Sequence, residues 1–251
     1  MRMAAKPSMT SLAVAALFAV GVALPAEAQQ GNGYLFHAPN VRFSLRGGYD
    51  HANANSDLFD QAVQDLSLNK SDFSSLTAGF EAAFTIGSRV DLSVDVGYSR
   101  SKHGSDFRHF IDNNDLPIEQ TTTFERVPIM ANLRVYLAPT GRSIGQLAWI
   151  PNKVVPFVGV GGGTMRYRFN QVGDFVDFQT TNVFPSEFNS EGWTPAMQGM
   201  GGVDFTITPM FAIRGEGRYV WAKAPLSRDF SGFNRIDLSG VQGTLGLTLR
   251  L

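Results

Sequence analysis

The end of the chain carries a strict two-residue repeat. Leucine stands at positions 245, 247, 249 and 251, and Gly246, Thr248 and Arg250 lie between these leucines. Because successive side chains of a β-strand point to opposite faces, the repeat places the leucines on one face and the small or polar residues on the other. A final strand of this kind can pair with the first strand of the same sheet. That pairing would close the sheet into a barrel.

Seven earlier segments show the same alternation of apolar and polar residues. The connections after the first, third, fifth and seventh segments are long and polar, whereas those after the second and sixth are two or three residues long. Outer-membrane barrels have short periplasmic turns and longer extracellular loops. The pattern therefore predicts an all-β fold, an eight-stranded antiparallel up-and-down transmembrane β-barrel. A ten-stranded barrel stays open if residues 175–181 form an additional hairpin. The predicted strands cover 40–51, 73–86, 89–99, 120–137, 154–169, 195–207, 211–221 and 235–251.

The first 28 residues have the pattern of a secretory signal peptide. Arg2 and Lys6 give a positive start, residues 11–24 form a short apolar run, and a small-x-small cleavage site ends at Ala28. The run is shorter than the ~20 residues that a membrane-spanning helix needs. We expect 1–28 to be the signal peptide, 29–39 a periplasmic segment and 40–251 the barrel. The chain has no cysteine, which excludes a lipoprotein and disulfide bonds.

Charged residues within the predicted strands share the face opposite the apolar one. A soluble barrel would turn this face to water, so the charge pattern alone does not decide between the two arrangements. The signal peptide and the aromatic residues near strand ends favour the inverted one, with the apolar face toward lipid. An eight-stranded lumen is only wide enough to be filled by side chains, so we predict that its charges pair with one another. The predicted lumen charges are Arg42, Arg46, Glu81, Asp91, Asp95, Arg126, Arg134, Asp204, Arg214, Glu216, Arg218 and Arg250.

The aromatic residues near strand ends are predicted to lie at the two membrane interfaces. They are Tyr49, Phe84, Tyr98, Phe124, Tyr136, Phe157, Tyr219 and Trp221. The connection 138–153 is the one long segment expected on the periplasmic side, and its Trp149 is predicted to be a further interfacial anchor. A short loop helix is expected after Ser56, because apolar residues from Leu58 to Leu66 follow at helical spacing.

Three stretches together resemble the OmpA/OmpX-type outer-membrane β-barrel domain family. They are the run 156–163, the strand 214–219 and the terminal alternation that ends at Leu251. The resemblance implies a place in the outer membrane, in contact with its lipids and lipopolysaccharide. It also implies insertion by the barrel-assembly machinery, which reads a terminal strand with an apolar, usually aromatic, last residue. Leu247, Leu249 and Leu251 would form this assembly signal, with leucine in place of the aromatic residue.

The sequence predicts a structural or surface-interaction role, with no catalytic, cofactor-binding or metal-binding residue. A net charge of −1 without a basic cluster argues against a nucleic-acid partner. The partner of the loops cannot be named from the sequence, because the loops carry no known binding motif.

Four alternative functions would use other residues of the chain. Uptake of small apolar solutes, as proposed for the resembling OmpW-type barrels, would use the loop aromatics Phe175, Phe178, Phe184, Phe188 and Trp193 with the apolar face of helix 58–66. A lipid A-modifying enzyme would need a serine beside one of the histidines 37, 51, 103 or 109. Asp106, Asp112, Asn113, Asn114 and Asp115 offer oxygen ligands for Ca²⁺ but lack the pattern of an EF-hand. The glycines at 159 and 161–163 are not followed by the Lys-Ser/Thr of a phosphate-binding loop.

Overall fold

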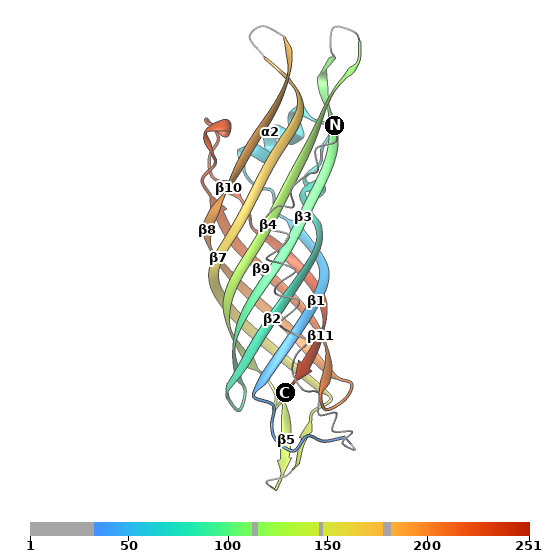
Figure 1. The fold of residues 1–251 in the computed structure, drawn as a ribbon, viewed down its shortest axis with the longest axis vertical. Coiled ribbons are helices and arrows are strands. Elements are labelled where there is room, and N and C mark those ends of the chain that lie inside the picture. Colours follow the sequence, from blue (N-terminus) through green and yellow to red (C-terminus); the bar gives the residue numbers. More distant parts are fainter. Residues whose placement is uncertain (1–32, 112–114, 146–147, 178–181) are drawn as a thin grey trace, which may run out of the picture. The chain divides into compact units, whose positions relative to one another are not determined.

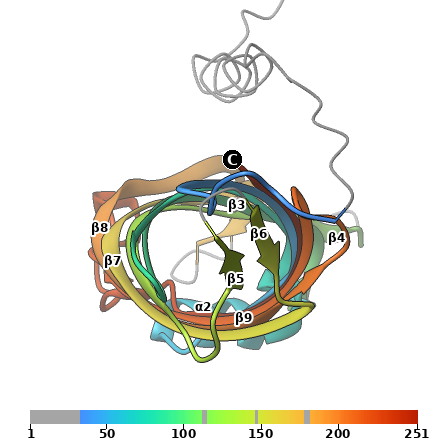
Figure 2. The same ribbon diagram turned by 90° about the horizontal axis from the view of Figure 1, so that it is seen from below.

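Eight long antiparallel strands form a closed ring in the computed structural model, which describes residues 33–111, 115–145, 148–177 and 182–251. Each strand pairs with the next, and the last pairs with the first (Figures 1 and 2). The predicted eight-stranded antiparallel barrel is thereby confirmed. The ring consists of β1 (Val41–Ala52), β2 (Ser75–Gly87), β3 (Val90–Ile111), β4 (Pro117–Tyr136), β7 (Val154–Val176), β8 (Val183–Thr206), β9 (Phe211–Ala224) and β11 (Gly240–Arg250).

The pairing of β11 with β1 closes the ring. It runs from Arg42 opposite Arg250 to Ala52 opposite Gly240, and the terminal Leu251 N–H donates to the Val41 carbonyl at 2.9 Å. Leu245 and Leu247 are exposed on the outer face, whereas Thr248 is buried in the lumen. The two-residue repeat therefore has the predicted direction, with its leucines pointing out of the barrel.

One end of the barrel carries the short turns and the other carries the longer excursions. Tight turns join β2 to β3 and β8 to β9 at the first end. At the opposite end lie helix α2 (Asp57–Asp65), the short helices η2 (Lys70–Phe73) and η3 (Arg228–Phe230), and β10 (Ile236–Asp237), which pairs with β9 (Figure 1). The predicted loop helix is α2. None of the described helices is long and apolar enough to cross a membrane.

The long connection 138–153 folds into a separate hairpin, β5 (Gly141–Ile144) and β6 (Ala148–Pro151), which lies across the short-turn mouth (Figure 2). The prediction that Trp149 is an interfacial anchor is wrong, because this side chain is buried. Its indole lies over Gly141, where a Cβ atom would come within 2.4 Å of the ring. Leu35 makes backbone hydrogen bonds to Trp149, so the segment before β1 also covers this hairpin.

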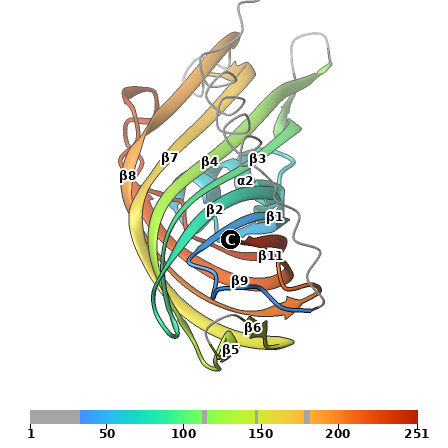
Figure 3. The ribbon, with the colours of Figure 1, turned by 60° about the horizontal axis from the view of Figure 1, so that its bottom comes forward.

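Two hairpins extend further than the sequence predicted. Residues 102–119 and 170–194 were expected to be loops, yet most of them continue the β3–β4 and β7–β8 pairs (Figure 3). Phe175 pairs with Phe184 inside the second extension, so these residues prolong existing strands and add no hairpin to the ring. The inward side chains of the extensions include Ser105, Gln171 and Ser190. The apolar–polar alternation that reveals a strand in a sequence is therefore missing here.

Three of the predicted interfacial aromatics point inward. Phe124, Tyr136 and Phe157 are buried in the barrel, so their assignment to the interface is wrong. Phe124 and Tyr136 stand two residues from Arg126 and Arg134, so they share the inner face with these buried arginines. Phe157 lies opposite Tyr136 on the neighbouring strand and faces the same way. Of the other predicted interfacial aromatics, Tyr49, Phe84, Tyr98 and Trp221 are exposed on the outer face, and Tyr219 is half-buried.

Candidate functional site

In the half of the barrel nearer the short turns, the lumen is filled by paired charges. Glu81 of β2 is their centre, because one carboxylate oxygen accepts from Arg134 at 2.6 Å and the other from Arg214 at 2.9 Å. Arg214 of β9 reaches on to Asp204 at 2.7 Å. Beside this group, Arg42 pairs with Asp91 at 2.5 Å. All these side chains are buried.

A second group of charges lies farther from the short turns and contacts the first group. Arg218 bonds to Asp95 at 3.1 Å and also pairs with Glu216, while Arg46 pairs with the same Asp95. Glu216 stands 3.8 Å from Arg134, which belongs to the first group. The two groups therefore form one network that spans the ring from β1 and β2 to β9.

Asp50 is a further buried lumen charge, which the sequence analysis did not identify. Its carboxylate pairs with Arg126 at 2.8 Å and accepts from Gln242 at 3.1 Å. Asp50 has the same strand parity as Arg42 and Arg46, so the alternation did hold the signal. With Asp50 included, six arginines meet six carboxylates: Arg42, Arg46, Arg126, Arg134, Arg214 and Arg218 with Asp50, Glu81, Asp91, Asp95, Asp204 and Glu216.

The remaining predicted lumen charge, Arg250, is also buried but stands apart from these pairs. Its guanidinium donates to the Thr206 hydroxyl at 2.9 Å. Among the ion pairs of the described residues, none involves a residue of β11. Those of β7 join Arg166 and Arg168 to Glu191 outside the lumen. Apart from Arg250, β11 turns small or uncharged side chains such as Thr244 and Thr248 to the lumen.

An aromatic cap closes the lumen above the charges. Phe59 of α2 is fully buried and lies 4.6 Å from the ring of Phe73, 5.3 Å from Phe124 and 5.8 Å from Phe169. Phe230 of η3 adds a further ring, 5.5 Å from Phe169. Phe124 and Phe169 stand opposite each other on β4 and β7. The amphipathic helix α2 thus inserts its apolar side into the mouth between the strands.

Replacing Phe59 by alanine should loosen this cap and leave the barrel intact. A buried Phe→Ala change costs about 3–5 kcal/mol, through lost burial and the cavity it leaves. Hydrogen exchange of residues 53–73 should therefore accelerate strongly, while the heat-modifiable mobility of the barrel on gels is retained. Gln64→Ala on the exposed side of the same helix is the matched control and should change little. Equal exchange in both variants would show that α2 is not held by this contact.

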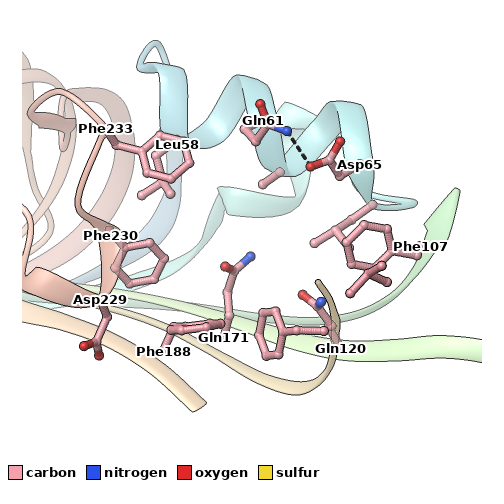
Figure 4. A pocket seen from close by; sticks show the side chains of 14 residues that line it. Leu58, Gln61, Asp65, Phe107, Gln120, Gln171, Phe188, Asp229, Phe230 and Phe233 are labelled. Atoms are coloured by element: carbon pink, nitrogen blue, oxygen red, sulfur yellow. Dashed lines mark hydrogen bonds between the residues drawn. The ribbon is translucent and has the colours of Figure 1, made fainter. Parts of the chain in front are cut away.

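A cavity of about 260 Å³ lies beside the cap, between α2 and the extended hairpins (Figure 4). Phe175 and Phe188, two of the predicted loop aromatics, line it together with Leu58, Ala62 and Leu66 of the predicted helix face. Phe184 and Trp193 do not line it and are exposed elsewhere, and Phe178 lies outside the described residues. The other lining residues are Gln61, Asp65, Phe107, Gln120, Gln171, Val176, Asp229, Phe230 and Phe233.

The residues weighed for enzymatic chemistry are spread over the molecule. His37, His103 and His109 are exposed. His51 Nδ1 lies 3.2 Å from the hydroxyl of Ser74, and that hydroxyl also accepts the Ala52 N–H at 3.2 Å. Because Ser74 is buried and engaged with the backbone, the pair fixes the end of β1 against the loop that precedes β2.

The residues weighed for metal and phosphate binding are also separated. In the described ranges, no three His, Cys, Asp or Glu side chains come together as a metal site would require. Asp112, Asn113 and Asn114 lie outside those ranges. The glycines of 159–163 stand within β7, where a Cβ on Gly163 would meet the Ile129 carbonyl oxygen at 2.1 Å. Gly159, Gly161 and Gly163 therefore permit the close approach of β7 to β4.

Asp57 ties the first turn of α2 to the loop before β10. Its carboxylate accepts hydrogen bonds at 2.8 Å from both the backbone N–H and the side-chain amide of Asn234. The backbone N–H of Asn234 lowers the pKa of the Asp57 carboxyl below its usual range. A carboxylate at the N-terminus of a helix is also favoured by the helix dipole.

In comparisons with known proteins, this chain resembles solved structures in its fold. No family model matches it. No curated protein does either. Among solved structures it is similar to Neisserial surface protein A (11% identity, 84% of this chain and 96% of that chain, TM-score 0.46). It is also similar to Ail, the attachment invasion locus protein of Yersinia pestis (13%, 84% and 99%, TM-score 0.42), and to the E. coli Outer Membrane Protein W (12%, 86% and 100%, TM-score 0.40).

Proposed function

We propose that this protein is an integral outer-membrane barrel with a structural or surface-interaction role and a lumen closed by paired charges. The observation that carries the proposal is the inverted arrangement of the barrel wall. Charges are buried inside, while Leu76, Val160, Met197 and Leu245 are more than 60% exposed on the outside. A continuous apolar outer wall is unfavourable in water and favourable in lipid.

A row of charges supports the position of the membrane boundary. Arg100, Glu125, Arg168 and Glu191 stand in register across β3, β4, β7 and β8. Below them the outward side chains are mainly apolar, with Tyr98 and Trp193 near the row. Four neighbouring strands thus lose their apolar outer face at one height. Above this row the hairpins extend into the region of the lipopolysaccharide head groups, which we propose as contacts of this surface.

The proposed topology places the loop end outside the cell and the short turns in the periplasm. It rests on export through the signal peptide 1–28, which lies outside the described residues, and on insertion by the barrel-assembly machinery. In this topology the cap and the cavity face the medium. The partner at this surface is expected to bind the loops, since the cavity there has about 260 Å³ and the pocket beside Glu81 and Arg214 in the lumen about 10 Å³.

The proposal predicts that the purified protein does not conduct ions. An ion entering the lumen would have to displace ion pairs whose separation leaves buried charges uncompensated, at a cost of about 3–5 kcal/mol each. Planar-bilayer recordings should show no steady conductance, whereas a general porin incorporated in the same way serves as the positive control. A stable open channel for the unaltered protein would overturn the closed lumen.

Uptake of small apolar solutes is a second candidate, and the cavity is the observation that favours it. Any route from the cavity through the barrel would cross the aromatic cap and then the charged network, which repels apolar solutes. Uptake of a hydrophobic dye into cells with and without the protein separates transport from binding at the surface. The proposed role is non-enzymatic, and mass spectrometry of lipid A from the same pair of strains tests that part.

A further inference from the structure

The charged side chains that line the cavity beside the aromatic cap are all negative. The cavity is lined by five phenylalanine rings, two carboxylates and three glutamine side chains, and none of the described lining residues is Lys, Arg or His. Asp65 of α2 and Asp229 of η3 lie on different sides of the cavity, with Phe188 and Phe230 toward its middle (Figure 4). One oxygen of each carboxylate already accepts a hydrogen bond, from Gln61 and from the Asn189 N–H respectively. An anionic ligand would therefore meet like charge on both sides and no compensating cation.

The glutamines add to this preference. The side-chain N–H of Gln120 donates to the Asp174 carbonyl at 2.9 Å, and that of Gln171 donates to the Thr122 hydroxyl at 3.4 Å. The Gln61 amide donates to the Asp65 carboxylate at 2.5 Å. Each amide thus spends one of its two N–H donors on the protein and retains the other together with its carbonyl oxygen. With the two carboxylates added, the polar side of the cavity holds more acceptors than donors, so it suits a ligand that carries N–H donors and positive charge.

The aromatic lining favours the same charge. Phe188 packs at 4.5 Å and nearly perpendicular to Phe175, and Phe230 follows at 6.2 Å. The face of an aromatic ring attracts a cation, and aromatic cages are a common way of binding organic ammonium groups. An apolar cavity of about 150 Å³ is large enough for benzene, so about 260 Å³ accommodates one ring with a short chain.

We propose that this cavity binds a small organic cation, an ammonium group on an aromatic or similarly apolar body. The body lies among the phenylalanine rings, and the ammonium group points to one of the two carboxylates. The site deepens the proposed surface-interaction role and rests on it for one point only, that the cavity faces the medium outside the cell.

Binding is tested with three soluble probes of nearly the same shape: 2-phenylethylammonium, 2-phenylethanol and phenylacetate. The full barrel is refolded in a non-ionic maltoside detergent, and ligand-observed NMR titrations are corrected with empty micelles. We expect the ammonium probe to bind with a Kd of about 0.1–1 mM, at least tenfold more tightly than phenylacetate and more tightly than the alcohol. Equal binding of all three probes, or binding of none, would overturn the proposal. The latter result would leave the rings as packing between loops.

Two variants and a control locate the effect. Asp65→Asn and Asp229→Asn should each weaken binding of the ammonium probe about twofold to fivefold, as expected for partly exposed charge pairs, and leave 2-phenylethanol nearly unchanged. Asp60→Asn makes the same change on the outward side of α2, where the carboxylate pairs with Lys70, and should have no effect. Phe188→Leu keeps an apolar wall but removes one ring face, and should weaken the ammonium probe roughly threefold to tenfold.

The outcomes separate this inference from the proposed function. A non-conducting barrel that binds none of the probes contradicts only the cation site. A barrel that conducts ions and still selects the ammonium probe contradicts only the closed lumen. Gel mobility before and after heating shows that each variant has folded, and equal loss of binding in Asp60→Asn and Asp65→Asn would also count against the site.

Discussion

Replacing Glu81 by leucine is expected to destabilise the barrel more than any other single change in its wall. Glu81 is buried and accepts hydrogen bonds from both Arg134 and Arg214. Among the carboxylates of the described residues, its removal leaves Arg134 with Glu216 at 3.8 Å, and it takes one of two carboxylates from Arg214. Breaking a buried ion pair by deleting one partner costs about 3–5 kcal/mol, because a charge stays buried without compensation.

The measurement is denaturant unfolding of the protein refolded in phosphatidylcholine vesicles, followed by tryptophan fluorescence and by heat-modifiable gel mobility. Glu187→Leu, on the exposed extension of β8, is the matched control and should shift stability by less than ~0.5 kcal/mol. The double variant Glu81→Leu/Arg134→Leu should recover part of the loss, since it removes the uncompensated cation together with its partner. A single variant as stable as the control would show that the charges do not hold the lumen.

Deleting Leu249–Leu251 should leave the chain unassembled in the periplasm, the largest effect expected from any change outside the lumen. Leu249 stands between Phe43 of β1 and Phe211 of β9. The Arg250 N–H donates to the Met210 carbonyl at 2.8 Å, and the Leu251 carbonyl accepts from Asn40 and Val41. Without these residues the backbone groups of two strands would face lipid unpaired, at several kcal/mol for each group.

Membrane fractionation, protease accessibility in the periplasm and heat-modifiable mobility give the readout for the truncation. Leu251→Phe restores the aromatic end typical of the resembling barrels and should preserve or raise the yield of inserted protein. Recovery of the truncated chain fully inserted would mean that the terminal residues are dispensable for both recognition and closure.

The sequence predicted the wall of the barrel well, because the wall obeys a local rule. In a strand that separates lumen from exterior, parity alone assigns Leu247 to one side and Thr248 to the other, and it placed the arginines beside the acids. The same rule would have assigned Asp50, Phe124 and Phe157 to the inside, had it been applied ahead of the expectation that aromatics near strand ends lie at the interface.

The loop end of the barrel, with α2 and the strand extensions, does not follow this alternation rule. The spacing of apolar residues predicts α2, but it does not show that Phe59 would meet Phe124 and Phe169, which belong to strands brought together by ring closure. The strand extensions are hidden for a related reason: beyond the lipid a strand needs no apolar outer face, so its backbone pairing leaves no pattern. The cavity combines both features, so the sequence predicted only part of its lining, the helix face 58–66 with Phe175 and Phe188, and not the residues that complete it.

The absence of β11 from the described ion pairs has a consequence for the order of folding. The matched arginines and carboxylates come from β1, β2, β3, β4, β8 and β9. A curled, still open sheet can therefore neutralise its interior while the C-terminal strand is held elsewhere. Of the buried lumen charges, the last strand brings only Arg250. In the proposed insertion by the barrel-assembly machinery, β11 can stay bound to that machinery until late and close the ring after the other strands have neutralised their charges.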